Sequence, residues 1–133
     1  MTMAAAAALG GCGSAPSASP THGAVIGIGE RDFHIQAPQH ITAGLVTIRD
    51  HNAGPEKHEL IIVRAASTQL PLRSDGLTVD EDRIKPRTVV SIPGIAPGHT
   101  QDTRLRLPPG HYLLFCNMAG HFRGGMHTEL VVS

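Results

Sequence analysis

Residues 108–126 read Pro-Pro-Gly-His-Tyr-Leu-Leu-Phe-Cys116-Asn-Met-Ala-Gly-His121-Phe-Arg-Gly-Gly-Met126. The large apolar residues before Cys116 predict a buried strand, and the Pro-Pro-Gly ahead of them predicts the turn at which it begins. Glycines after the strand allow the chain to curl tightly. The stretch therefore predicts a strand that ends in a loop carrying a thiol, an imidazole and a thioether.

The rest of the chain has the signals of short strands separated by turns. The sequence contains 15 Gly and 10 Pro, many of them between apolar or alternating segments. Residues 68–85 lack this alternation and predict a long excursion with one helical turn. We therefore expect an all-β fold, a Greek-key β-sandwich of about seven to eight strands, with strands near residues 25–28, 33–37, 45–50, 58–65, 88–92, 100–107, 111–117 and 128–132.

Composition narrows the class of protein. A chain of 133 residues with 41% hydrophobic and 17% charged residues is long enough for one domain whose core needs no disulfide. Aromatic residues make up only 3%, so the core is expected to be aliphatic. The formal net charge is zero and no basic stripe is present, so we expect no nucleic-acid partner.

The first 23 residues differ from the rest, and we expect the folded domain to span residues 24–133. Leu9-Gly10-Gly11-Cys12 follows a run of small apolar residues and precedes a Ser-, Ala- and Pro-rich segment. It resembles a bacterial lipobox, in which Cys12 would be lipidated and the following segment would act as a flexible tether to the membrane surface. The apolar run is too short to span a bilayer.

This segment predicts a protein that is exported, either as a cell-membrane lipoprotein or into the periplasm or cell envelope. It differs from a typical export signal because no Lys or Arg precedes Cys12. The alternative is an alanine-rich tail with an incidental cysteine.

A second imidazole stands far upstream of the loop, at His58. Two His, one Cys and a weakly bound Met are the ligand set of a blue copper site. A soft thiolate at Cys116 suits both copper states, His58 and His121 complete a trigonal plane, and Met126 is the axial donor. His127 competes as a ligand but ranks lower, because neighbours in an extended strand point to opposite sides.

The loop motif and the upstream segment Asn52-Ala-Gly-Pro-Glu-Lys-His58 together resemble the cupredoxin family, most closely the bacterial exported copper-binding lipoproteins. The resemblance covers residues 24–133. It implies one type 1 copper ion held by His58, Cys116, His121 and Met126. In plastocyanins and azurins the upstream His is followed by Asn, where this chain has Glu59. Asn52 or Asn117 is expected to supply a supporting hydrogen bond to the loop or thiolate, and the sequence leaves open which.

The implied function is that of a one-electron carrier between redox partner proteins outside the cytoplasm, and not that of an enzyme. The alternative is copper storage, delivery or resistance at the same site. Motifs of hydrolases are absent from the sequence, and zinc does not explain a Met ligand. Met118 and Phe122 are expected either to form an apolar surface for electron transfer or simply to pack within the loop. Arg123 is a candidate for steering an acidic partner.

Overall fold

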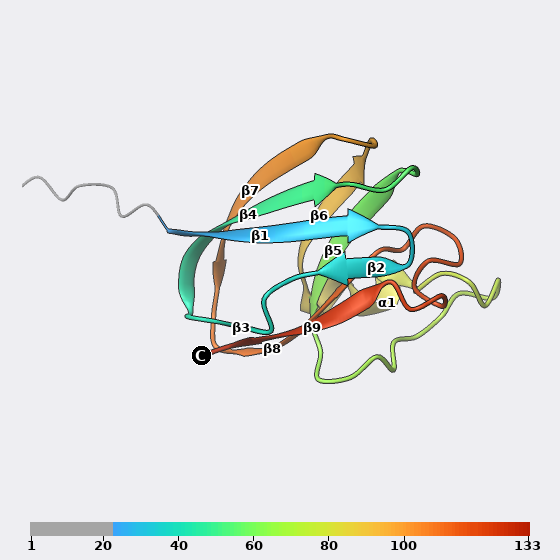
Figure 1. The fold of residues 1–133 in the computed structure, drawn as a ribbon. Helices are drawn as coiled ribbons and strands as arrows, with labels where there is room; N and C mark the ends of the chain where they lie inside the picture. Colours follow the sequence, from blue (N-terminus) through green and yellow to red (C-terminus); the bar gives the residue numbers. More distant parts are fainter. Residues whose placement is uncertain (1–22) are drawn as a thin grey trace, which may run out of the picture.

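The computed structural model describes residues 23–133, so the predictions for residues 1–22, including lipidation of Cys12, lie outside the described residues. Two sheets pack face to face (Figure 1). The first has the order β2-β1-β4-β7 and contains β1 (Ala24–Arg31), β2 (His34–Gln36), β4 (Gly44–Asn52) and β7 (Thr100–Leu107). The second has the order β3-β9-β8-β5-β6 and contains β3 (His40–Ile41), β5 (His58–Arg64), β6 (Thr88–Ile95), β8 (Gly110–Phe115) and β9 (His127–Val132).

This architecture confirms the predicted all-β sandwich, and the strand count is slightly higher than predicted. The additional strand is β3, a pair of residues that the apolar pattern is too short to reveal. β1 pairs in parallel with β4, and β3 pairs in parallel with β9, whereas the other ladders are antiparallel. Parallel neighbours need crossover connections, so the chain passes repeatedly from one sheet to the other.

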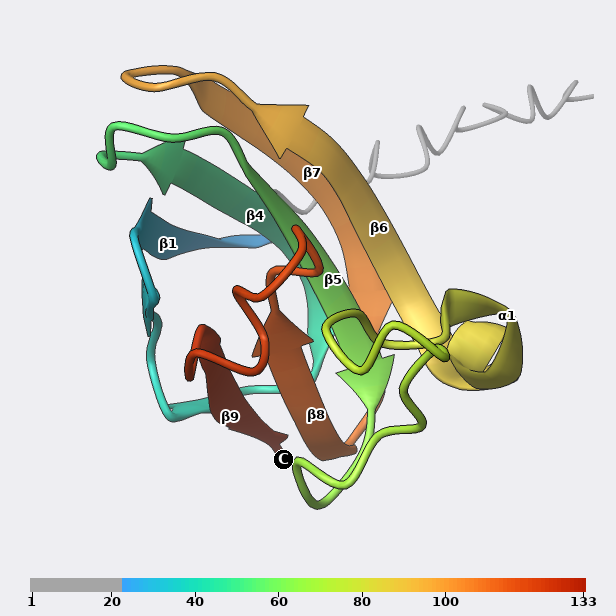
Figure 2. The same cartoon turned by 90° about the vertical axis from the view of Figure 1, so that its right-hand side faces the viewer.

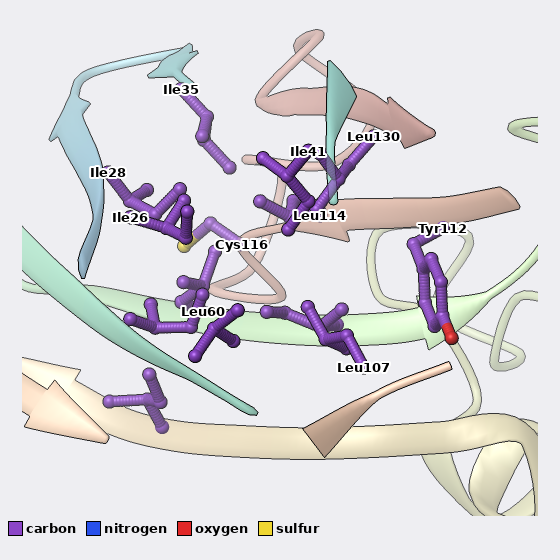
Figure 3. Packing of buried hydrophobic residues seen from close by; sticks show 14 of the residues in the cluster. Ile26, Ile28, Ile35, Ile41, Leu60, Leu107, Tyr112, Leu114, Cys116 and Leu130 are labelled. Carbon is purple, nitrogen blue, oxygen red and sulfur yellow. The ribbon is translucent and has the colours of Figure 1, made fainter. Parts of the chain in front are cut away.

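The main core lies between the two sheets and follows the period-two alternation of the strands. In β1 the inward side chains include Ile26 and Ile28, and in β4 they include Ile48. Ile26 and Ile28 face Leu60 of β5 and Leu114 of β8 (Figure 3), and Ile48 belongs to the same cluster. Each such side chain stabilises the fold by about 1.5–3 kcal/mol when it leaves water. Cys116 belongs to this cluster, so the candidate ligand is part of the core.

A second, smaller core lies on the outer face of β5 and β8. Because these strands are buried on both faces, they read as continuous apolar runs and not as alternating ones. Their cover is the predicted excursion, which ends in the helical turn α1 (Glu81–Ile84) and the 3-10 turn η1 (Lys85–Arg87). Asp80 caps α1 by accepting a hydrogen bond from the backbone N–H of Arg83. The cluster consists of Ile61, Val63, Leu70, Val79, Ile84, Leu113, Phe115 and Phe122.

No helix within residues 23–133 has the length and apolar character needed to cross a membrane.

Candidate metal centre

Two neighbouring strands bring the upstream imidazole to the thiol. His58 is the first residue of β5, and Cys116 follows the last residue of β8. The strands are antiparallel, with Ile61 opposite Phe115, so these two ends meet. The Sγ atom of Cys116 lies 3.9 Å from Nδ1 of His58 and 3.4 Å from Nδ1 of His121. Ligand atoms of all three residues lie within 4.8 Å of one another.

The loop between Cys116 and Met126 folds back on itself through its own backbone. The N–H of Cys116 donates to the carbonyl of Met126 at 3.2 Å, and the N–H of Met126 donates to the carbonyl of His121 at 3.0 Å. Gly120 and Gly125 have positive φ angles of 83° and 98°, which side chains with a Cβ rarely adopt. Met126 is fully buried in the same core cluster as Cys116. Met126 therefore lies in the same buried core as Cys116, at the end of the loop that carries His121.

The environment of the Cys116 thiol favours its protonated form when no metal is bound. Burial raises the pKa of Cys116 to about 11, although the backbone N–H of Glu59 donates to its Sγ at 3.5 Å. A thiol with this pKa is protonated at neutral pH when no metal is bound. A coordinated metal ion reverses this preference, because its charge stabilises the thiolate. Glu59, the residue after His58, contacts the sulfur through its backbone N–H.

Carboxylates orient both imidazoles. Nε2 of His58 lies 3.1 Å from Oδ1 of Asp32, and Nε2 of His121 lies 3.2 Å from Oε2 of Glu56. A proton on Nε2 donates to the carboxylate and leaves Nδ1, the atom that faces Cys116, free to bind a metal. Burial lowers the pKa of His58, which keeps this ring neutral near pH 7. The sequence alone did not reveal either carboxylate.

The two asparagines that the sequence singled out both fasten loops. Nδ2 of Asn52 donates to the carbonyls of Glu56 and Ile95 at 2.7 and 2.8 Å, and its Oδ1 accepts from the N–H of Gly54 at 2.9 Å. These bonds shape the turn before His58.

Asn117 ties the copper loop to the excursion. Its Oδ1 accepts from the N–H of Val79 at 2.7 Å, while its Nδ2 donates to the Val79 carbonyl at 3.1 Å and to Oε1 of Glu81 at 2.7 Å. The N–H of Gly120 adds a bond of 3.3 Å to the carbonyl of Leu77. The segment that follows the thiol is thus fixed by contacts remote in sequence.

One of the two residues expected at the electron-transfer surface lies inside the protein. Met118 is half-buried against the main core. Phe122 is only 7% exposed, and its ring packs edge-on against the ring of Phe115, with 5.3 Å between the ring centroids. The expectation of an exposed Phe122 was therefore wrong. The ring of Phe122 points inward because it packs into the second core, which the loop covers. The exposed ring near the site is Phe33, which is 54% exposed and lies 5.5 Å from the ring of His121.

Phe33 was predicted to begin a strand, but it lies in the turn between β1 and β2 with a φ of 60°. Its placement beside His121 depends on β1 pairing with β2. The one local signal was a large aromatic residue beside charged neighbours in a chain that has few aromatics.

Two further carboxyl groups are buried near the site. Glu30 and Asp50 are fully buried, and their oxygens have no hydrogen-bond partner among residues 23–133. Burial raises the pKa of Glu30 to about 8, with a further contribution from the charge of Asp50, and burial raises the pKa of Asp50 to about 7. Glu30 was expected to follow the end of a strand, but β1 continues through it, and the inward alternation of Ile26 and Ile28 carries it into the interior.

A known protein family matches the part of the chain that carries these ligands. The family model of the sulfocyanin (SoxE) domain matches residues 17–133. The chain belongs to this family. The sulfocyanin domain covers both motifs that resembled the cupredoxins and therefore confirms that family assignment. No curated protein matches the chain.

Solved structures of auracyanins and rusticyanin share the fold of this sulfocyanin domain. Auracyanin from Roseiflexus castenholzii is 17% identical, with a TM-score of 0.64 over 84% of this chain and 98% of its own. Auracyanin A from Chloroflexus aurantiacus, described as a "blue" copper protein, is 24% identical, with a TM-score of 0.62 over 82% and 98% of the two chains. Rusticyanin from Thiobacillus ferrooxidans is 14% identical, with a TM-score of 0.61 over 84% and 79%.

The donor set fits copper. His58, Cys116, His121 and Met126 form a type 1 copper site, and the protein is a blue copper electron carrier and not an enzyme. When bound, copper supplies a one-electron couple that soft sulfur and imidazole donors accommodate in both oxidation states. The chain contributes a buried thiol, two oriented imidazoles and a loop held by its own hydrogen bonds.

Proposed function

We propose that this sulfocyanin domain carries single electrons between redox partner proteins on the outer side of a cell membrane, to which lipid on Cys12 attaches it. The observation that carries the electron-transfer part is the preorganised donor set, in which imidazole and thiol ligand atoms lie within 4.8 Å of one another. A site whose donors are already positioned changes little between oxidation states, so electron transfer requires little rearrangement.

Hydrogen bonds hold the chain before His58 and after Cys116. This supports an electron carrier over a protein that releases its metal. Asn52 secures the turn before His58, and Asn117 secures the segment after Cys116. Cys116 and Met126 are fully buried, so a competing ligand in solvent has no direct access to either sulfur atom. A protein for copper storage or delivery would benefit from a more open site.

A copper titration tests the site. Cu(II) added to the purified full chain should give intense thiolate-to-copper absorption in the visible range and narrow copper hyperfine splitting in EPR. Cys116→Ser is the control and should lose both. A faint colour with ordinary splitting that the substitution leaves unchanged would contradict a type 1 centre.

Metal exchange separates the carrier from the delivery alternative. The protein is reduced to its Cu(I) form and mixed with a Cu(I) chelator of moderate affinity. Retention of Cu(I) over many minutes supports the carrier. Rapid and complete transfer to the chelator favours copper storage or delivery at the same ligands.

Membrane attachment is supported by the lipobox-like Leu9-Gly10-Gly11-Cys12 and by the Ser-, Ala- and Pro-rich segment after it. Expression of the full chain in a bacterium fed with a labelled fatty acid tests this attachment. Label should enter the wild-type protein in the membrane fraction and be lost in Cys12→Ser. A wild-type protein that stays unlabelled in the cytoplasm would contradict both lipidation and export.

A further inference from the structure

A cationic cleft of about 680 Å³ lies beside the copper loop. The excursion between β5 and α1 supplies one wall, the two helical turns supply another, and the copper loop supplies the third. Excursion and copper loop lie at the same end of the molecule, which faces the viewer in Figure 2. The lining residues are Thr68, Gln69, Leu70, Pro71, Leu72, Arg83, Arg87, Phe122 and Arg123.

Three guanidinium groups from separate parts of the fold line this cleft. Arg83 lies in α1 and Arg87 in η1, and both side chains line the cleft. Arg123 reaches the cleft from the copper loop. All three are exposed. Within the part of the chain that the structure describes, none of the three forms an ion pair with a carboxylate.

The acidic residues of α1 lie on a different side of the helical turns from the two arginines. Glu81, Asp82 and Lys85 line a different, smaller cavity of about 280 Å³. Glu81 is also engaged by the side-chain amide of Asn117. The acidic residues of α1 are thus directed away from the arginine cleft, and its positive charge is left available for a ligand.

The size and lining of the cleft favour a peptide segment over a small ion. Its volume could hold about 20 water molecules at about 30 Å³ each, so an inorganic oxyanion would fill only a small part. Pro71 and Leu72, both half-buried, add apolar surface beside the guanidinium groups. This combination suits a chain that presents carboxylates together with apolar side chains.

The cleft adjoins a copper ligand. Phe122 and Arg123 directly follow His121, and the loop is held by bonds from Gly124 to Gly120 at 2.8 Å and from Met126 to His121 at 3.0 Å. A partner in this cleft would therefore contact the rigid loop that carries the imidazole. The chain has no formal net charge, so electrostatic steering depends on such local clusters.

We propose that the arginine cleft is the docking surface for an acidic, carboxylate-bearing segment of the redox partner protein. This inference rests on the proposed role as an electron carrier between proteins. It extends the steering role expected of Arg123 alone, because Arg83 and Arg87 supply the rest of the charged surface.

A binding experiment with the copper-loaded full chain tests the cleft. The probe is a fluorescein-labelled peptide of alternating Glu and Leu, followed by fluorescence anisotropy at low salt. Arg83→Gln combined with Arg87→Gln should weaken binding roughly fivefold, and Arg123→Gln should weaken it roughly twofold, as expected for exposed ion pairs. The matched control is Arg104→Gln combined with Arg106→Gln, which removes two exposed charges from β7 and should leave the affinity unchanged.

Equal weakening in the control, or no weakening in the cleft variants, would overturn the proposal. Displacement of the peptide by inorganic phosphate, but not by chloride at equal ionic strength, would also overturn it in favour of a small-anion site. The visible spectrum of each variant reports the copper site separately. A wild-type protein that binds the peptide at the arginines but lacks the type 1 band would retain the docking surface while refuting the electron-carrier function.

Discussion

Two groups of buried polar side chains lie near each other at one end of the sandwich and differ in how their polar atoms are satisfied. Around the copper ligands, the imidazoles contact Asp32 and Glu56, and the thiol accepts an N–H from Glu59. In the carboxyl pair, the oxygens of Glu30 and Asp50 have no hydrogen-bond partner in the described part of the chain. A buried polar atom with a partner stabilises one geometry, whereas one without a partner costs free energy, most of all when it is charged. The comparison predicts that the ligands gain stability from a metal and that the pair gains it from protons.

The largest effect is expected from copper itself. A metal that binds only the folded protein should raise the free energy of unfolding by about 4 kcal/mol at a free concentration of about 1,000 times its Kd. Cys116→Ser should lose most of this gain because the soft donor is absent. Urea unfolding with and without Cu(I) measures both. An equal gain in the variant would mean that copper stabilises the protein from another site.

The carboxyl pair should make the metal-free protein less stable as pH rises. Glu30 has its pKa raised to about 8 and Asp50 to about 7, so the folded state binds more protons than the unfolded state between about pH 4 and pH 8. The stability is fully present below that range and is lost as pH rises through it. Glu30→Gln should flatten this dependence, with a difference on the order of several kcal/mol across the range.

Urea unfolding of metal-free wild type and Glu30→Gln at pH 5 and pH 8 measures that difference. Glu129→Gln, which removes an exposed carboxylate from β9, is the control and should behave as the wild type does. If Glu30→Gln retains the full dependence on pH, the pair is not its source.

Asn117 tests the hydrogen bonds that hold the loop of the copper ligands. Asn117→Ala removes the side-chain hydrogen bonds of this amide to the excursion and leaves the backbone polar groups of Val79 without those partners. The expected loss is about 1–3 kcal/mol of unfolding free energy. Gln101→Ala, an exposed change on β7, should cost far less. Equal losses in both variants would show that the loop does not depend on this amide.

The smallest effect is expected from the carboxylate behind His58. Asp32→Asn keeps the size of the side chain but removes the charge that orients Nε2, so the affinity for Cu(II) should fall about tenfold. Asp82→Asn, an exposed acidic position on α1, provides the control. Competition with a Cu(II) chelator measures both. An unchanged affinity in Asp32→Asn would mean that the protein positions the ring by packing alone.

The copper ligands and the carboxyl pair also differ in how well the sequence predicted them. The four copper ligands were found because their residue types are chemically specific and three lie within one loop of eleven residues, Cys116 to Met126. The carboxyl pair was missed because a charged residue in a strand normally faces water. The predicted strand stopped before Glu30, and nothing local indicated that β1 would continue inward.

Phe122 and Phe33 illustrate the same limit. Both are aromatic residues near a ligand, and sequence position favoured Phe122 as the exposed one. The second core on the outer face of β5 and β8 buries Phe122, whereas a turn with positive φ leaves Phe33 exposed beside His121. Only the packing of the excursion against the sheet distinguishes the two.

The sequence by itself determined the all-β class, most of the strand positions, the long excursion and the copper donors, because periodicity and ligand chemistry are local properties. The tertiary structure decided which carboxylates orient the imidazoles, since Asp32 lies 26 residues from His58 and Glu56 lies 65 residues from His121. It also decided that Arg83, Arg87 and Arg123 share one cleft. Such contacts form only when the sheets and the excursion close around one core, so no local pattern encodes them.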